Sequence, residues 1–140
     1  MEGVNISGIY PADLNDPRGM TYEWCKGILG LQLTVFERKK GTVFGGHYHK
    51  GLDPSKNPER LFLIKGQLKL LAHNGMIDSS LEETVNEGEE LLIFPGIIHS
   101  FHSLTDIIIL EYRSTIFDRN NSDTFSPETY QTYIDSMKKL

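Results

Sequence analysis

The stretch Gly41-Thr-Val-Phe-Gly-Gly-His47-Tyr-His49 is the part of the sequence on which the fold prediction rests. If it forms a β-strand, its side chains alternate between two faces. Val43, His47 and His49 then share one face, and Tyr48 occupies the other. Two imidazoles on one face can bind a metal ion or transfer a proton. The stretch therefore predicts a functional site on a strand.

Two other parts of the sequence supply groups that can join this histidine pair. Glu59 begins an apolar segment that turns at Gly66, and His99 follows a Pro95-Gly96 turn. Three imidazoles and one carboxylate suit a divalent transition metal such as zinc, manganese, iron or nickel, and leave coordination positions for water or substrate. Without a metal, a neutral histidine is a competent general base near neutral pH. The residues alone leave both possibilities open.

The composition describes one acidic domain. The chain has 140 residues and a net charge of −5, so we expect a single domain over residues 1–140 that does not bind nucleic acid, whose phosphates require a surplus of Lys and Arg. No apolar run approaches the roughly 20 residues that cross a bilayer, and the first residues lack the basic start of a signal peptide. The single cysteine, Cys25, fits a reducing compartment. These features predict a cytoplasmic protein without a membrane partner.

Short apolar runs between turns predict many short strands. Thirteen Gly and six Pro separate these runs, a pattern typical of an antiparallel sandwich or barrel. The strand that begins at Glu59 is apolar on both faces and should be covered on both, on one side by the core and on the other by the second subunit of a homodimer. The polar segment 50–58 is predicted to be a loop that forms a rim or lid of the site. Ser126 and Pro127 suit the start of a short C-terminal helix.

These residues resemble the two motifs of the cupins. The first motif is similar to Gly41-x5-His47-x-His49 with Glu59-x6-Gly66, and the second to Gly88 through Pro95-Gly96-Ile-Ile-His99. The resemblance implies an all-β fold, the double-stranded β-helix or cupin jelly roll, often dimeric, with a short C-terminal helix added here. It also implies a metal bound by His47, His49, Glu59 and His99. The nine residues between His49 and Glu59 are more than the family usually has, which indicates either an inserted loop or the loss of the ligand role of Glu59.

Shorter matches resemble enzymes that act on sugar nucleotides. Asp16-Pro-Arg18-Gly19 is similar to the start of the dTDP-4-dehydrorhamnose 3,5-epimerases and of the C-terminal cupin domain of capsular polysaccharide hexulose reductases. Gly45-Gly-His47-Tyr-His49-Lys50 is similar to the paired-histidine segment of the dTDP-4-keto-6-deoxyhexose 3,4-ketoisomerases. The resemblance implies an epimerase or isomerase of a keto-sugar nucleotide or related carbohydrate in polysaccharide biosynthesis. It implies His47 or His49 as base, Tyr48 or Tyr112 as acid, and, for the diphosphate, Arg18, Lys50, Arg60 or Arg113.

Two other function classes use the same residues. An Fe(II)-dependent dioxygenase would bind oxygen at the metal, and a non-catalytic module would bind a small ligand in the same cavity. The fold cannot choose among the three classes, because this architecture carries unrelated functions.

Overall fold

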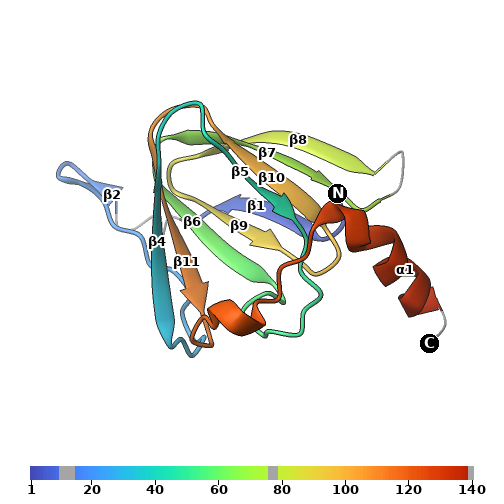
Figure 1. Ribbon diagram of the computed structural model, residues 1–140. Coiled ribbons are helices and arrows are strands. Elements are labelled where there is room, and N and C mark those ends of the chain that lie inside the picture. The colour runs from blue at the N-terminus through green and yellow to red at the C-terminus, as the bar shows by residue number, and fades with distance from the viewer. Residues whose placement is uncertain (10–14, 76–78, 139–140) are drawn as a thin grey trace.

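The computed structural model describes residues 1–9, 15–75 and 79–138, and in these residues two antiparallel sheets face each other (Figure 1). One sheet has the strand order β1-β9-β6-β11-β4 and the other β5-β10-β7-β8, while β2 and β3 form a separate hairpin. This arrangement confirms the predicted all-β jelly roll with a C-terminal helix. The strands and helices are β1 (Val4–Gly8), β2 (Asn15–Asp16), β3 (Gly19–Met20), β4 (Gln32–Arg38), β5 (Val43–His47), β6 (Glu59–Lys65), β7 (Gln67–His73), β8 (Ser80–Asn86), β9 (Glu89–Ile93), β10 (Ile98–Ser103), β11 (Ile107–Arg113), the 3₁₀ turns η2 (Arg119–Asn121) and η3 (Pro127–Thr129), and α1 (Tyr130–Lys138).

The core lies between the two sheets and follows the period-two pattern of the strands. On β11, Ile107 and Ile109 are buried, and Glu111 and Arg113 continue the same inward face. The charged pair therefore enters the interior in phase with two isoleucines. The remaining buried apolar side chains of this core come from both sheets and the segments between them: Val4, Leu61, Leu63, Leu68, Leu70, Ala72, Val85, Leu91, Ile93, Ile97 and Phe101.

A β-bulge in β5 changes which residues face inward. Gly45 and Gly46 both have positive φ, +82° and +75°, a conformation that glycine adopts at little cost. A Cβ on Gly45 would lie 3.2 Å from the carbonyl oxygen of His99, so β10 approaches this backbone closely. Across the bulge, His47 stays opposite His99, but Val43 points outward with 63% of its surface exposed. The prediction that Val43 shares the histidine face is wrong, and Phe44 takes its place in the interior.

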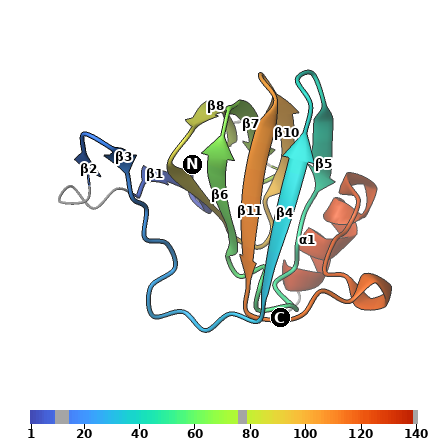
Figure 2. The ribbon, with the colours of Figure 1, turned by 90° about the vertical axis from the view of Figure 1, so that its left-hand side faces the viewer.

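The outer face of the five-stranded sheet is only partly covered. Phe62 on β6 packs against the rings of Tyr22 and Trp24, with centroids 5.4 and 5.6 Å away. The second face of β6 is therefore covered at this point by the N-terminal arm of the same chain rather than by another subunit. β4, at the front of this sheet in Figure 2, is its edge strand. Leu33 and Val35 of β4 remain 58% exposed, which leaves an apolar strip along this strand.

The C-terminal segment packs on the outer face of β5. Tyr48 is fully buried there, with the ring of Tyr130 edge-on at 5.0 Å and that of Tyr133 stacked at 5.3 Å. Ser126 precedes the 3₁₀ turn η3, although its side chain makes no capping hydrogen bond. Among the described residues, no helix has the length and apolar character needed to cross a membrane.

Candidate metal centre and cavity

A cavity of about 280 Å³ lies between the two sheets. Its walls are mainly apolar, and its polar groups come from β4, β5, β6, β11 and the loop after β5. The lining residues are Gln32, Thr34, Phe36, Arg38, Phe44, Gly45, His47, His49, Lys56, Glu59, Leu61, Phe101, Ile109, Glu111, Arg113, Phe117 and Thr124.

Three histidines from two distant parts of the chain meet beside this cavity. The rings of His47 and His49 are 4.9 Å apart, those of His47 and His99 4.9 Å, and those of His49 and His99 5.1 Å. One nitrogen of each ring lies within 4.8 Å of the others. The nearly equal spacing is that expected of three imidazoles directed at one point. We call His47, His49 and His99 the histidine cluster.

Backbone carbonyls hold two of these rings in position. Nδ1 of His49 donates to the carbonyl oxygen of Asp123 at 2.6 Å, and Nδ1 of His99 donates to that of Ile97 at 2.9 Å. Each ring therefore directs Nε2 toward Glu59, whose Oε2 lies 2.8 Å from His49 and 3.5 Å from His99. A backbone carbonyl on the second nitrogen is the usual support of a metal-binding histidine.

The residues fit a divalent transition metal. Nε2 of His99 is buried without a hydrogen-bond partner, and such an atom normally has one. Nε2 of His49 faces a carboxylate oxygen, and two acceptors at that distance need a proton or a cation between them. An ion held by the histidine cluster and Oε2 of Glu59 would satisfy both requirements, with the imidazole and carboxylate donors that such metals prefer.

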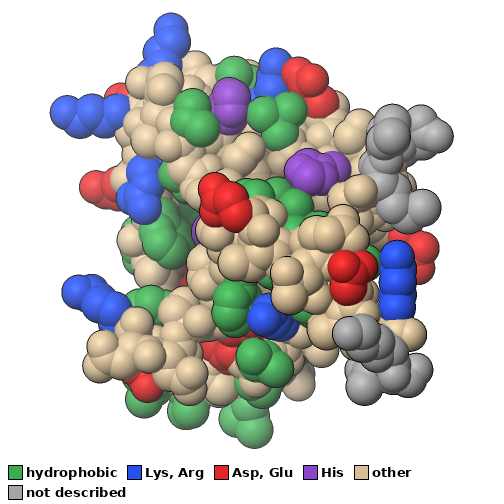
Figure 3. Space-filling view, turned by 45° about the vertical axis from the view of Figure 1, so that its right-hand side comes forward, with side chains coloured by type: hydrophobic (Ala, Val, Ile, Leu, Met, Phe, Trp, Pro, Cys, Tyr) green, Lys and Arg blue, Asp and Glu red, His purple; other side chains and the backbone are tan. Residues whose placement is uncertain are grey.

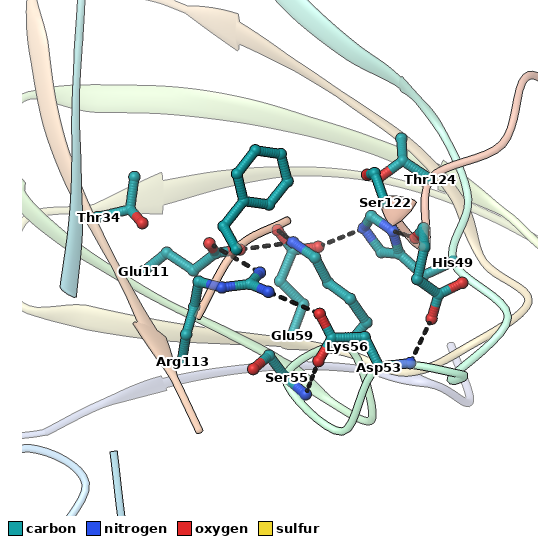
Figure 4. Close-up of polar contacts among 12 residues, drawn as sticks. Thr34, His49, Asp53, Ser55, Lys56, Glu59, Glu111, Arg113, Ser122 and Thr124 are labelled. Atoms are coloured by element: carbon teal, nitrogen blue, oxygen red, sulfur yellow. Dashed lines mark hydrogen bonds and ion pairs between the residues drawn. The ribbon is translucent and has the colours of Figure 1, made fainter. Parts of the chain in front are cut away.

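A chain of buried charges continues from Glu59 along the cavity (Figure 4). The ammonium of Lys56 donates to Oε1 of Glu59 at 3.3 Å and to Oε2 of Glu111 at 2.6 Å. Arg113 lies 3.5 Å from the other oxygen of Glu111 and 2.6 Å from a carboxylate oxygen of Asp53. We call Glu59, Lys56, Glu111, Arg113 and Asp53 the charged chain. It gives each buried charge a partner of opposite sign, as burial requires.

The surroundings set the protonation of these groups. Burial, with the nearby imidazoles of His99 and His49, lowers the pKa of His47 to about 3, so its ring is neutral near pH 7, as a metal ligand must be. Burial alone would raise the pKa of Glu59, but the Lys56 ammonium and the adjacent imidazoles of His49 and His99 hold this pKa well below its ordinary value. Burial, with the negative charge of Glu59, raises the pKa of Glu111 above its ordinary value, and the Lys56 ammonium opposes this shift.

The loop between His49 and Glu59 forms a wall of the site. Lys56 is only 8% exposed, so the loop folds inward. The carboxylate of Asp123 accepts hydrogen bonds from the backbone amides of Lys50 and Asp53, at 2.8 and 3.1 Å. The loop therefore borders the cavity, as predicted for a rim, because Lys56 lines it. Asp123 of the C-terminal segment holds this loop at Lys50 and Asp53.

The two tyrosines predicted as acids do not reach the cavity. Tyr48 lies on the outer face of β5, and its hydroxyl is hydrogen-bonded to that of Thr129 at 2.6 Å. Tyr112 points away from Glu111 to the outer face of β11, and its hydroxyl donates to the carbonyl oxygen of Ile28. Both assignments are wrong because strand alternation turns these side chains outward.

Three of the four cations predicted for the diphosphate also lie outside the cavity. Arg18 is exposed in the turn of the β2-β3 hairpin, Lys50 lies over the ring of Phe125 at 4.1 Å, and Arg60 lies near Glu90 on the outer face of β6. Arg113 does line the cavity, but Asp53 and Glu111 already pair with it. None of the four is therefore placed to receive an anionic substrate in this cavity.

Sequence reasoning missed several groups of the site. Lys56 and Asp53 lie in a loop, where no periodicity indicates which side chains turn inward. Glu111 could have been found, because it lies in phase with two isoleucines in an apolar strand. Arg38 could have been found in the same way, as the last inward position of β4.

The chain resembles known proteins in structure but not in sequence. No model of a protein family matches the chain, and no curated protein matches it. Several solved structures are similar to it. The sugar 3,4-ketoisomerase QdtA from Thermoanaerobacterium thermosaccharolyticum, in complex with TDP, is 20% identical over 99% of this chain and 97% of its own, with a TM-score of 0.71.

Two epimerases are also similar. The dTDP-4-dehydrorhamnose 3,5-epimerase from Sulfolobus tokodaii is 22% identical over 86% of this chain and 74% of its own, with a TM-score of 0.65. ChmJ, a 3'-monoepimerase from Streptomyces bikiniensis in complex with dTDP-quinovose, is 18% identical over 90% of this chain and 70% of its own, with a TM-score of 0.69. The chain thus has the cupin-type fold that its two histidine motifs predict, and it shares that fold with sugar-nucleotide epimerases and ketoisomerases.

Proposed function

We propose that this protein is a metal-dependent isomerase or epimerase of a keto-sugar nucleotide. The observation that carries the proposal is the convergence of the histidine cluster and Glu59 on one cavity. The fold adds support, because QdtA and ChmJ, which share it, were solved with TDP or a dTDP-sugar bound.

In this proposal each polar group of the cavity has a stated part. His47, His49, His99 and Oε2 of Glu59 hold the ion. A divalent metal bound there would polarise the keto oxygen of the substrate. The carboxylate of Glu111 takes a proton from the carbon beside the keto group, and the carboxylic acid so formed returns it to another face or atom, a role that its raised pKa favours.

The rest of the cavity positions these groups. The Lys56 ammonium fixes the carboxyls of Glu59 and Glu111 relative to each other. The apolar walls, which include Leu61, Phe101 and Ile109, reduce the access of water to the intermediate in which the proton is on the enzyme.

Proton exchange with solvent tests this function directly. The protein is first stripped of metal and then reloaded separately with Zn²⁺, Mn²⁺, Fe²⁺ or Ni²⁺. TDP-4-keto-6-deoxyglucose in D₂O is expected to gain deuterium at a carbon beside the ketone only with loaded protein, which NMR detects. Absence of exchange with every metal and with the stripped protein would reject the proposed reaction. Exchange that is equal with stripped protein would reject its dependence on metal.

We also propose that the protein is a cytoplasmic homodimer that serves polysaccharide biosynthesis. The free Cys25 fits a reducing compartment. The apolar strip formed by Leu33 and Val35 on β4 and by Leu31 just before it, at 58%, 58% and 69% exposure, supports a covering subunit, because strips of this kind mark protein interfaces. A keto-sugar nucleotide converted here would be a precursor for polysaccharide assembly.

A charge in the strip tests the dimer. Leu33→Asp is expected to convert the wild-type dimer to a monomer in size-exclusion chromatography with light scattering, because the aspartate would be buried without a partner. Leu52→Asp changes a leucine that is 75% exposed on the loop after β5 and should remain dimeric. A monomeric wild-type protein would disprove the dimer.

A further inference from the structure

The cavity has three cations, and only one of them is available to a ligand. Lys56 and Arg113 are neutralised within the charged chain. Arg38 also lines the cavity, and within residues 1–9, 15–75 and 79–138 it makes no ion pair. An anionic group that enters the cavity therefore finds its free positive charge at Arg38.

The guanidinium of Arg38 is held in place by two aromatic rings. Its central carbon lies 5.3 Å from the centroid of Phe36 and 5.3 Å from that of Phe44. One nitrogen donates to the carbonyl oxygen of Glu37 at 2.8 Å. Stacking on aromatic faces leaves the in-plane N–H groups of a guanidinium directed outward, and these groups match the oxygens of a phosphate. Arg38 is thus preorganised without being neutralised.

The local charge favours the same ligand. Arg38 is followed by Lys39 and Lys40, both exposed in the β4-β5 turn, and neither makes an ion pair with the described residues. Lys and Arg side chains lie along the left side in Figure 3, with acidic side chains between them. In a chain of net charge −5, the consecutive cations Arg38, Lys39 and Lys40 attract anions locally.

The position of Arg38 relative to the histidine cluster suits a sugar nucleotide. Phe44, which contacts the guanidinium, lies three residues before His47 on β5. The glycine bulge interrupts the strand between these two residues, and Phe44, His47 and Arg38 all line the same cavity. A hexose ring with its reacting carbon at the cluster would extend its anomeric diphosphate toward Arg38.

We infer that Arg38 binds the diphosphate of the substrate, with Phe36 and Phe44 holding its guanidinium. The inference rests on the proposed function for the identity of the sugar, but it concerns a residue that the family resemblance does not supply. It replaces Arg18, Lys50, Arg60 and Arg113, which the sequence suggested.

Calorimetric titration with TDP and with inorganic diphosphate tests the inference. Arg38→Gln is expected to weaken the binding of both about tenfold to a hundredfold, because hydrogen bonds to a charged group are lost. Lys138→Gln removes an exposed cation at the end of α1 that does not line the cavity, and should change the affinity less than about threefold, as expected for a screened surface charge. Arg38→Lys should recover only part of the affinity, because it keeps the charge and loses the planar fork.

Turnover separates this inference from the proposed function. If the wild-type protein catalyses deuterium exchange, Arg38→Gln should raise KM by about the factor by which it weakens TDP binding. It should leave kcat and the metal content near wild type. If Arg38→Gln changes neither the affinity for TDP nor KM, the inference is overturned while the function stands. If Arg38→Gln weakens TDP binding as expected but neither the wild-type protein nor any variant exchanges deuterium, the inference stands and the proposed function fails. If wild-type protein binds neither TDP nor diphosphate, the inference is overturned.

Discussion

His47→Asn is expected to lower the proposed deuterium exchange about a thousandfold or more and to abolish binding of the proposed metal. Asn preserves the polarity of the position but removes one of the imidazoles of the histidine cluster, and a Lewis acid contributes several kcal/mol to such a reaction, where 1.36 kcal/mol is tenfold in rate. Elemental analysis of the purified variant measures the metal, and NMR in D₂O measures the exchange.

The matched control for this variant is His102→Asn. His102 is a histidine on the outer side of β10, opposite Lys69 and Val43 and away from the cavity, so its replacement should leave metal and exchange near wild type. Retention of metal by His47→Asn with loss of exchange would overturn the ligand role and make His47 a general base. Normal metal and normal exchange in His47→Asn would remove this site from the reaction.

Lys56→Met destabilises the metal-free protein by about 3–5 kcal/mol, the usual cost of removing one partner from a buried ion pair. Methionine fills much of the volume of lysine, but Glu59 and Glu111 then face each other without their shared cation. Urea unfolding measures the change as a lower midpoint at constant slope.

Two variants make this result specific. Lys69→Met breaks the exposed pair between Lys69 and Glu82, which is 2.9 Å long with side chains 36% and 60% exposed, and should cost less than about 1 kcal/mol. Adding Glu111→Gln to Lys56→Met removes one of the two uncompensated charges and should recover part of the lost stability. A loss within about 1 kcal/mol for Lys56→Met alone would show that the charged chain does not stabilise the fold.

Both expectations depend on features that the sequence reveals unequally. The jelly roll and the convergence of His47, His49 and His99 follow from short-range patterns: strand alternation, turn residues and motif spacing. Such patterns are local, and each predicts the direction of a side chain from its neighbours. For this reason the sequence predicts that Tyr48 lies on the strand face opposite His47 and His49. Its burial beneath the C-terminal segment confirms that orientation.

Local patterns fail where one residue interrupts the alternation. The two glycines of β5 insert a bulge, so the inward position moves from Val43 to Phe44. This shift also brings Phe44 to Arg38. A prediction that continues the strand alternation through Gly45 and Gly46 therefore misses the contact between Phe44 and Arg38.

Charge pairing over long sequence separation is the second limit. Arg113 looked available for a phosphate, but Asp53, sixty residues away, occupies its guanidinium at 2.6 Å. Lys56 looked like a solvated loop residue, but the fold places it between two buried carboxylates. A single sequence does not show which distant charges meet, so the accessible cation, Arg38, emerged only from the three-dimensional arrangement.

The link between His49 and Asp123 has a consequence for biosynthesis. The backbone oxygen that orients the imidazole, and the carboxylate that anchors the loop before Glu59, both belong to a residue made 74 positions after that histidine. A nascent chain still on the ribosome can form its hairpins without a fixed ion-binding geometry. Affinity for the proposed metal should therefore arise only after the segment that carries Asp123 has left the exit tunnel.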